Sequence, residues 1–197
     1  MPDARHFQIA FLTAFLLYGI NALGWHTDVG KYAVLLGTGA ATQAVLAHWR
    51  GQGADTLKSS LISCLSLSIL LYAGALWVYA FAAFLAVAGK YALRFRGKHL
   101  FNPANFGIIA AIVLTGQAWI SPGQWGQQGA MLFFIAGFGA TVLLKVGRWD
   151  TGIAFLGTFL GCFFVYNILW RQWPLDFFWH QATNGALWLF SLFMITD

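Results

Sequence analysis

Charge is the property that this sequence has least of. Only 9% of its 197 residues are charged, glutamate is absent, and six aspartates stand against 11 lysines and arginines. A soluble domain carries about 25% charged residues. With a hydrophobic content of 59%, this scarcity excludes a disordered chain, a coiled coil and a nucleic-acid-binding module. We expect an integral membrane protein, whose net charge of +5 comes from basic cytoplasmic loops.

Cysteine is also scarce, and it carries no recognisable chemistry. Cys64 and Cys162 both lie in apolar runs, and no CxxC spacing occurs. This favours two core residues over a disulfide, a zinc site or an iron–sulfur site. The sequence also lacks a Walker motif, GxGxxG and HExxH, and no serine, histidine and acid suggest a triad. We therefore predict no metal ligands and no catalytic residues.

Long apolar stretches dominate what is present. A helix needs about 20 apolar residues to cross the hydrocarbon core of a bilayer. Eight candidate segments occur, at residues 7–24, 31–49, 57–72, 75–93, 103–119, 128–145, 151–170 and 177–197. The third and fifth are short, and the third is rich in serine, as is typical of half-helices. The sequence therefore predicts an all-α polytopic membrane protein, one transmembrane domain over 1–197, with about eight spanning or half-spanning helices.

The basic residues give this arrangement an orientation. With the N-terminus in the cytoplasm, nine of the 11 lysines and arginines fall on the cytoplasmic side, as the positive-inside rule expects. These are Arg5, Arg50, Lys58, Lys90, Arg94, Arg96, Lys98, Lys145 and Arg148, whereas Lys31 and Arg171 fall outside. The cluster from Lys90 to Lys98 has two interpretations. It can orient the chain and contact lipid head groups, or it can bind an anionic substrate or partner.

The first of three polar islands lies at residues 55–63. Asp55 and Thr56 can cap the helix that follows. Ser59 and Ser63 are four residues apart, so they share one face of that helix. Their hydroxyls can bond to the backbone or join neighbouring helices, or they can contribute to a binding site.

The second island, at residues 96–107, is centred on Asn102-Pro103. Proline forces the preceding residue out of the α region, so a helix must begin here. The N–H groups of its first turn then point into the loop, with the positive end of the helix dipole behind them. Asn102 and Asn105 add donors and acceptors. This segment can bind a carbonyl-rich heterocycle or an anion, or it can be a helix cap alone.

The third island, at residues 180–185, interrupts the last apolar segment. It contains His180, Thr183 and Asn184. Polar groups inside a membrane segment are functional candidates by default. His180 can equally lie at the membrane interface, beside Trp179.

Three segments resemble the NqrB/RnfD family, the membrane subunits of sodium-translocating NADH:quinone reductase and of Rnf electron-transport complexes. GKHLFNPANFG at 97–107 resembles the family segment NLFNPA. SSLIS at 59–63 looks like its SALLT stretch, which follows an acid as it follows Asp55 here. The segment from His180 to Asp197 resembles HLLSGG…FFMATD. RGKHLFNP and SPGQWG, at 96–103 and 121–126, are closest to the UnbU-like subgroup.

The resemblance implies a fold of two inverted repeats with broken helices, and it implies that the chain stops at Asp197 before the family's last helices. It also implies flavin. The family binds FMN covalently at the threonine of an [S/T]GAT motif, but here residues 138–141 read FGAT, without the leading Ser or Thr. We therefore interpret Thr141 as a core residue and expect a non-covalent riboflavin or FMN. The residues expected to hold it are Asp55, Ser59, Ser63, Lys98, His99, Asn102, Asn105, Thr183 and Asn184.

The resemblance predicts a membrane subunit of a flavin-dependent electron-transport complex, in a bacterial inner membrane. It would relay electrons across or along the membrane with other membrane subunits, and quinone is a candidate acceptor. Such a subunit would be part of an oxidoreductase without activity alone. Two alternatives remain: a transporter or channel for a small neutral solute such as riboflavin, and a structural subunit whose flavin site is empty.

Overall fold

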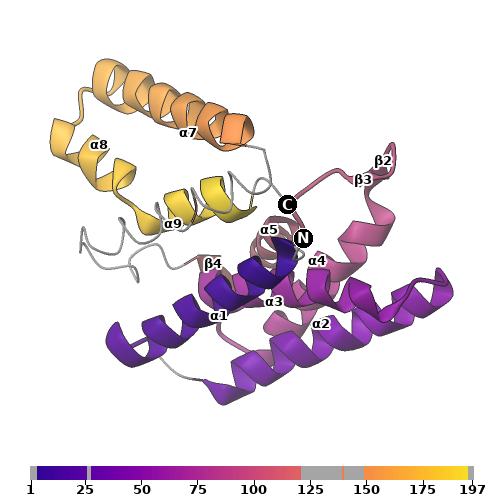
Figure 1. The fold of residues 1–197 in the computed structure, drawn as a ribbon. Helices are drawn as coiled ribbons and strands as arrows, with labels where there is room; N and C mark the ends of the chain where they lie inside the picture. Colours follow the sequence, from indigo (N-terminus) through magenta and orange to yellow (C-terminus); the bar gives the residue numbers. More distant parts are fainter. Residues whose placement is uncertain (1–3, 26–27, 121–138, 140–148, 195–197) are drawn as a thin grey trace. The chain divides into compact units, whose positions relative to one another are not determined.

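The computed structural model describes residues 4–25, 28–120, 139 and 149–194, which fold into two compact units, Met1–Ser121 and Pro122–Asp197. Each unit is described by itself. Both are mostly helical (Figure 1), which confirms the all-α prediction. The polytopic membrane arrangement and the single transmembrane domain over 1–197 stay predictions.

The first unit is a bundle of five helices in which α3 is central. Its helices are α1 (Ala4–Ala22), α2 (Val29–Trp49), α3 (Leu57–Leu70), α4 (Leu76–Ala92) and α5 (Pro103–Thr115), with a 3-10 turn, η1 (Ala54–Thr56), before α3. Helix α3 packs against all four others, and α4 packs against α2 and α5. These helices match the first five apolar segments of the sequence.

Two short strands replace helix where the sequence predicted more of it. The segments 57–72 and 103–119 were expected to be helical throughout, but α3 ends at Leu70 and α5 ends at Thr115. Gly116 ends α5 because it takes the left-handed conformation, with φ of 63°. Strand β1 (Leu71–Ala73) then pairs antiparallel with β4 (Ala118–Ile120). This ladder supplies hydrogen bonds to backbone groups that have left the helices.

The second unit contains helices that are interrupted. Helix α7 (Trp149–Phe163) continues as a π-helix, η3 (Phe164–Trp170), and α8 (Leu175–Ala182) follows. The last segment was expected as one helix over 177–197. It is divided instead into α8, α9 (Gly185–Leu189) and a π-helical turn, η4 (Phe190–Met194). The expected helix at 128–145 lies outside the described residues.

A ladder of phenylalanines lines α7. The rings of Phe155, Phe159 and Phe163 stack at centroid distances of 6.0 and 6.1 Å, and Phe177 continues the stack at 5.7 Å. The spacing of four residues places these rings on one face of the helix. By length and composition, Trp149–Trp170 is long and apolar enough to cross a membrane, and among the described residues it is the one helix that passes this test.

A caged lysine joins three elements of the first unit. Lys31, at the start of α2, is only 2% exposed. Its Nζ lies 4.1 Å from the ring centroid of Tyr72 on β1, and 5.5 and 5.6 Å from those of Tyr79 and Tyr32. Among the described residues this Nζ has no hydrogen-bond partner. The rings and the negative charge of nearby Asp28 together provide the attraction that stabilises the buried cation.

We predict that Tyr72→Leu lowers the free energy of unfolding by about 1–2 kcal/mol, because a desolvated ammonium loses its nearest ring. Tyr72→Phe retains the ring and should stay close to the wild type. Chemical unfolding of detergent-purified protein, followed by circular dichroism, measures both changes.

The same substitution in a Lys31→Met background separates the charge from simple packing. There Tyr72→Leu should cost less, because no buried cation remains to be left without a partner. An equal cost in both backgrounds would show that Tyr72 only fills space.

Candidate functional site

The turn before α5 is built as the sequence predicted. Asn102 is the N-cap, with φ of −59° and ψ of 125°, and Pro103 follows at the first position of the helix. The Asn102 Oδ1 accepts a hydrogen bond from the backbone N–H of Asn105 at 3.1 Å. Both asparagines are half-buried. Asn102 is therefore a helix cap, and any role in ligand binding would be additional to that.

A flat aromatic surface adjoins this turn. The rings of Phe101 and Phe106 stack with 6.0 Å between centroids and 14° between planes. Phe106 packs against Gly89 of α4, where an added Cβ would lie 2.9 Å from the ring. At Gly107 an added Cβ would lie 2.6 Å from the carbonyl oxygen of Ala82. Glycine at these two positions lets α4 and α5 approach closely, and Phe101 stays exposed beside Asn102.

A buried lysine holds the start of α3 to the end of α4. Lys90 is 4% exposed, and its Nζ donates to the carbonyl oxygen of Ser59 at 2.7 Å and to the Ser59 Oγ at 2.9 Å. The Ser63 hydroxyl donates to the same carbonyl at 3.1 Å. The two predicted serines therefore do lie together. Ser59 accepts both hydrogen bonds of the lysine, and the Ser63 hydroxyl bonds to the backbone of its own helix, which is one of the roles that the sequence left open for these hydroxyls.

The sequence reasoning missed this role of Lys90, because it assigned the residue to an exposed basic cluster. The signal was present, since Lys90 lies within the apolar run 75–93. A cation inside such a run must find a partner.

Asp55 is instead at the surface. Its side chain is 80% exposed and pairs with Lys58 at 3.0 Å, and its backbone oxygen accepts a hydrogen bond from Arg5 at 3.3 Å. Thr56 is the N-cap of α3, but it makes no side-chain cap bond, and its hydroxyl donates to the Gly53 oxygen. Thr56 therefore occupies the expected N-cap position, but its side chain does not make the expected capping bond. The hydroxyl of Thr56 points back towards Gly53, which precedes it in the turn, and away from the N–H groups of α3.

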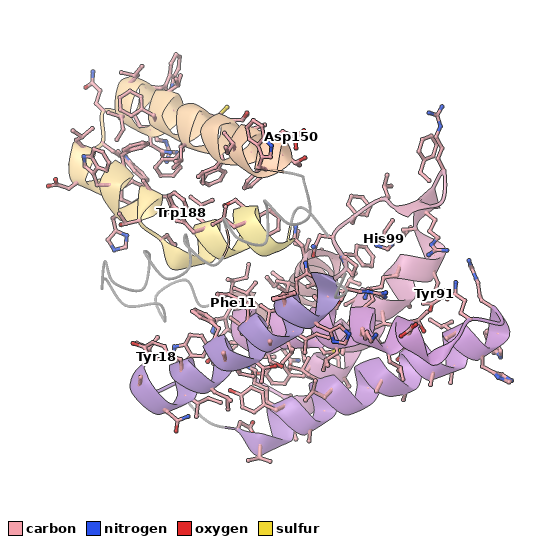
Figure 2. All side chains as sticks on the ribbon, in the orientation of Figure 1. Phe11, Tyr18, Tyr91, His99, Asp150 and Trp188 are labelled. Atoms are coloured by element: carbon pink, nitrogen blue, oxygen red, sulfur yellow. The ribbon has the colours of Figure 1, made fainter. Side chains whose placement is uncertain are left out.

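Lys98 and His99 lie on a β-hairpin that the sequence reasoning did not predict. Strand β2 (Arg94–Phe95) pairs with β3 (Lys98–His99), so that Arg94 faces His99 and Phe95 faces Lys98. His99 is exposed, on the hairpin beyond the end of α4 (Figure 2). Positive φ angles at Arg96 and Gly97, 50° and 82°, fit a two-residue type I′ turn. The glycine was the available signal for this turn.

Thr183 and Asn184 mark the break between α8 and α9. The Thr183 hydroxyl donates to the carbonyl of Trp179 at 2.8 Å, and the Asn184 carbonyl accepts from the N–H of Leu187 at 3.1 Å. Both residues belong to the second unit, so their part in a common site with Asn102 stays a prediction. Thr141 lies outside the described residues.

A groove of about 370 Å³ opens between α2 and α3. Apolar side chains line most of it, and Lys58, Ser60 and Cys64 also contribute. Its size is within the range of small-molecule sites. None of the predicted flavin-binding residues lines it, so it does not coincide with the Asn102 turn.

No known protein family matches this chain, and no curated protein matches it either. The resemblance to the NqrB/RnfD family therefore stays a prediction, carried by three short segments.

We predict that Asn102→Ala lowers the free energy of unfolding by about 1 kcal/mol, because the N–H of Asn105 loses its acceptor. Asn102→Ser retains a capping oxygen and should cost a few tenths of that. Urea unfolding in detergent compares the two variants, and equal losses would argue against the cap as the cause.

Proposed function

We propose that the chain is a polytopic membrane subunit that holds a non-covalent flavin beside Asn102 and relays electrons within a larger membrane complex. The observation that carries the membrane part is the distribution of side chains in the first unit, where polar groups are buried and large apolar groups are exposed.

The buried polar residues of this unit include two lysines, two glutamines and four serines. They are Gln8, Lys31, Gln43, Ser60, Ser63, Ser66, Ser68 and Lys90. Exposed apolar residues on α4 and α5 include Trp77, Phe84, Ile109, Val113 and Leu114, and Val113 is 73% exposed. Lysine is almost never fully buried in a soluble protein unless it is paired. Both halves of this pattern are expected in a lipid bilayer, where apolar side chains face the lipid tails and polar side chains face the interior of the protein.

The lengths of α3 and α5 support segments that cross only part of the bilayer. These two helices have 14 and 13 residues, and at 1.5 Å per residue they extend about 20–21 Å. The hydrocarbon core is about 30 Å thick. Strand backbone such as the β1–β4 ladder is tolerated at membrane depth where protein surrounds it. Leu71 of this ladder is fully buried, whereas Trp119 and Ile120 on β4 are exposed, so protein covers only part of the ladder.

The flavin part rests on the Asn102 turn and on the resemblance. An isoalloxazine is planar and carries carbonyl groups, and the exposed ring of Phe101 offers a stacking surface. The Asn102 amide carries N–H groups of the kind that donate to carbonyl oxygens, and the positive end of the α5 dipole favours the partial negative charge of such oxygens. Such contacts would hold and orient the ring and tune its reduction potential, while the flavin supplies the redox chemistry.

The first test is the visible absorption spectrum of detergent-purified protein, repeated on the supernatant after acid precipitation. We expect flavin bands that leave with the supernatant, because no covalent attachment is proposed. Bands that stay with the pellet would overturn the non-covalent assignment. If no bands appear even after riboflavin or FMN is added, the structural-subunit alternative is favoured.

The matched variant for this test is Asn102→Ser. It keeps an oxygen for the helix cap but removes the amide, so we expect a folded protein with about tenfold weaker flavin binding, the loss of one hydrogen bond. Wild-type flavin affinity in Asn102→Ser would contradict the site assignment.

The electron relay is tested separately from binding. In proteoliposomes, the reduced flavin of a relay subunit should be reoxidised by added quinone or by an outer acceptor. Uptake of riboflavin into the lumen without such reoxidation would favour the transporter alternative.

A further inference from the structure

The hairpin between α4 and α5 presents cations and large apolar side chains together. We refer to residues 93–100 as the basic hairpin. Its two strands stand beyond the end of α4 (Figure 1), and a further hydrogen bond of 2.9 Å, from Leu100 N–H to the Leu93 carbonyl, extends their ladder. The two-residue turn and this extra bond define the register of the hairpin, and so they set which side chains lie opposite one another.

The basic hairpin exposes large apolar side chains, which the surface of a soluble protein usually keeps few in number. Phe95 is 63% exposed and Leu100 is 59% exposed, and Phe101 next to the hairpin is 53% exposed. Arg94 and Arg96 are exposed among them. Surfaces that combine large apolar side chains with arginine occur where a protein enters the boundary between lipid head groups and acyl chains.

The arginines of the basic hairpin rest against aromatic rings. The Arg96 guanidinium lies 5.3 Å from the ring centroid of Phe95, and that of Arg94 lies 5.8 Å from the ring centroid of Tyr91. A guanidinium held this way keeps its N–H donors available for planar recognition of phosphate oxygens.

The basic hairpin is far from any acidic residue in the sequence. No acidic residue occurs between Asp55 and Asp150, whereas this stretch contains Lys58, Lys90, Arg94, Arg96 and Lys98. Charge complementarity therefore favours an anionic occupant. The exposed apolar residues continue along α4 and α5, at Phe84 and Ile109, which favours a lipid surface over an acidic protein.

We propose that the basic hairpin is a binding site for anionic phospholipid, with Arg94 and Arg96 on the phosphate groups and Phe95 and Leu100 in the acyl boundary. This rests on the membrane part of the proposed function and is independent of the flavin. The proposal assigns the basic hairpin a preference for anionic over neutral phospholipid, in addition to its contribution to the orientation of the chain.

Native mass spectrometry of the detergent-purified protein tests this directly. Phosphatidylglycerol and phosphatidylcholine with the same acyl chains are titrated, and the dissociation constant of the tightest retained lipid is measured. We expect the wild type to prefer phosphatidylglycerol, and Arg94→Gln with Arg96→Gln to weaken its binding about tenfold, leaving phosphatidylcholine unchanged.

The control variant, Lys58→Gln with Arg171→Gln, removes the same number of charges elsewhere and should keep the preference. A second variant, Phe95→Ser, keeps both arginines and should weaken both lipids. Unchanged phosphatidylglycerol binding in the arginine variant, or equal loss in the control, would overturn the proposal. The flavin content of the arginine variant should stay at the wild-type level, so the two proposals can fail separately.

Discussion

Hydrogen bonds from buried polar side chains to backbone carbonyls connect the central helix of the first unit to its neighbours, whereas Lys31 is held by aromatic rings instead. The Ser60 hydroxyl donates to the Gly39 carbonyl at 2.9 Å, and the Ser68 hydroxyl donates to the Cys64 carbonyl at 2.8 Å. Lys90 is held by Ser59 in the same way. A buried polar group without a partner costs more than a hydrogen bond contributes. The Ser60 bond therefore joins α3 to α2 and the Lys90 bonds join it to α4, while the Ser68 bond stays within α3.

Close approach of the helices follows from the same constraint. The Ser60 bond requires α3 to lie against the backbone of α2, and Gly39 permits this because an added Cβ would overlap Cys64. Gly89 and Gly107 do the same for α4 and α5. Small residues at such contacts let the backbones of neighbouring helices approach closely. Gly39 therefore sets the distance at which the Ser60 hydroxyl reaches the backbone of α2, and Gly89 and Gly107 set the distance between α4 and α5.

Local chemistry made part of the fold predictable from sequence, and tertiary contacts determined the rest. Pro103 restricts Asn102 through covalent geometry, so the start of α5 was correctly placed. The cage around Lys31 unites α2, β1 and α4, and no local pattern predicts it. The basic hairpin was missed because helix periodicity was followed up to Leu93 and the turn signal at Gly97 was not used. For the candidate site, the turn and the pairing of Ser59 with Ser63 were predictable, but the burial of Lys90 depends on α3.

The basic hairpin and the Asn102 turn are adjacent in the chain. Only Leu100 and Phe101 separate β3 from the cap of α5, and the Phe101 ring stacks on Phe106, which in turn packs against Gly89. The Phe101 ring is therefore held by packing within α4 and α5, and this packing does not involve the exposed arginines of the hairpin. Since Phe101 also provides the aromatic face beside Asn102, the candidate flavin site keeps its shape when lipid contact at the hairpin is lost.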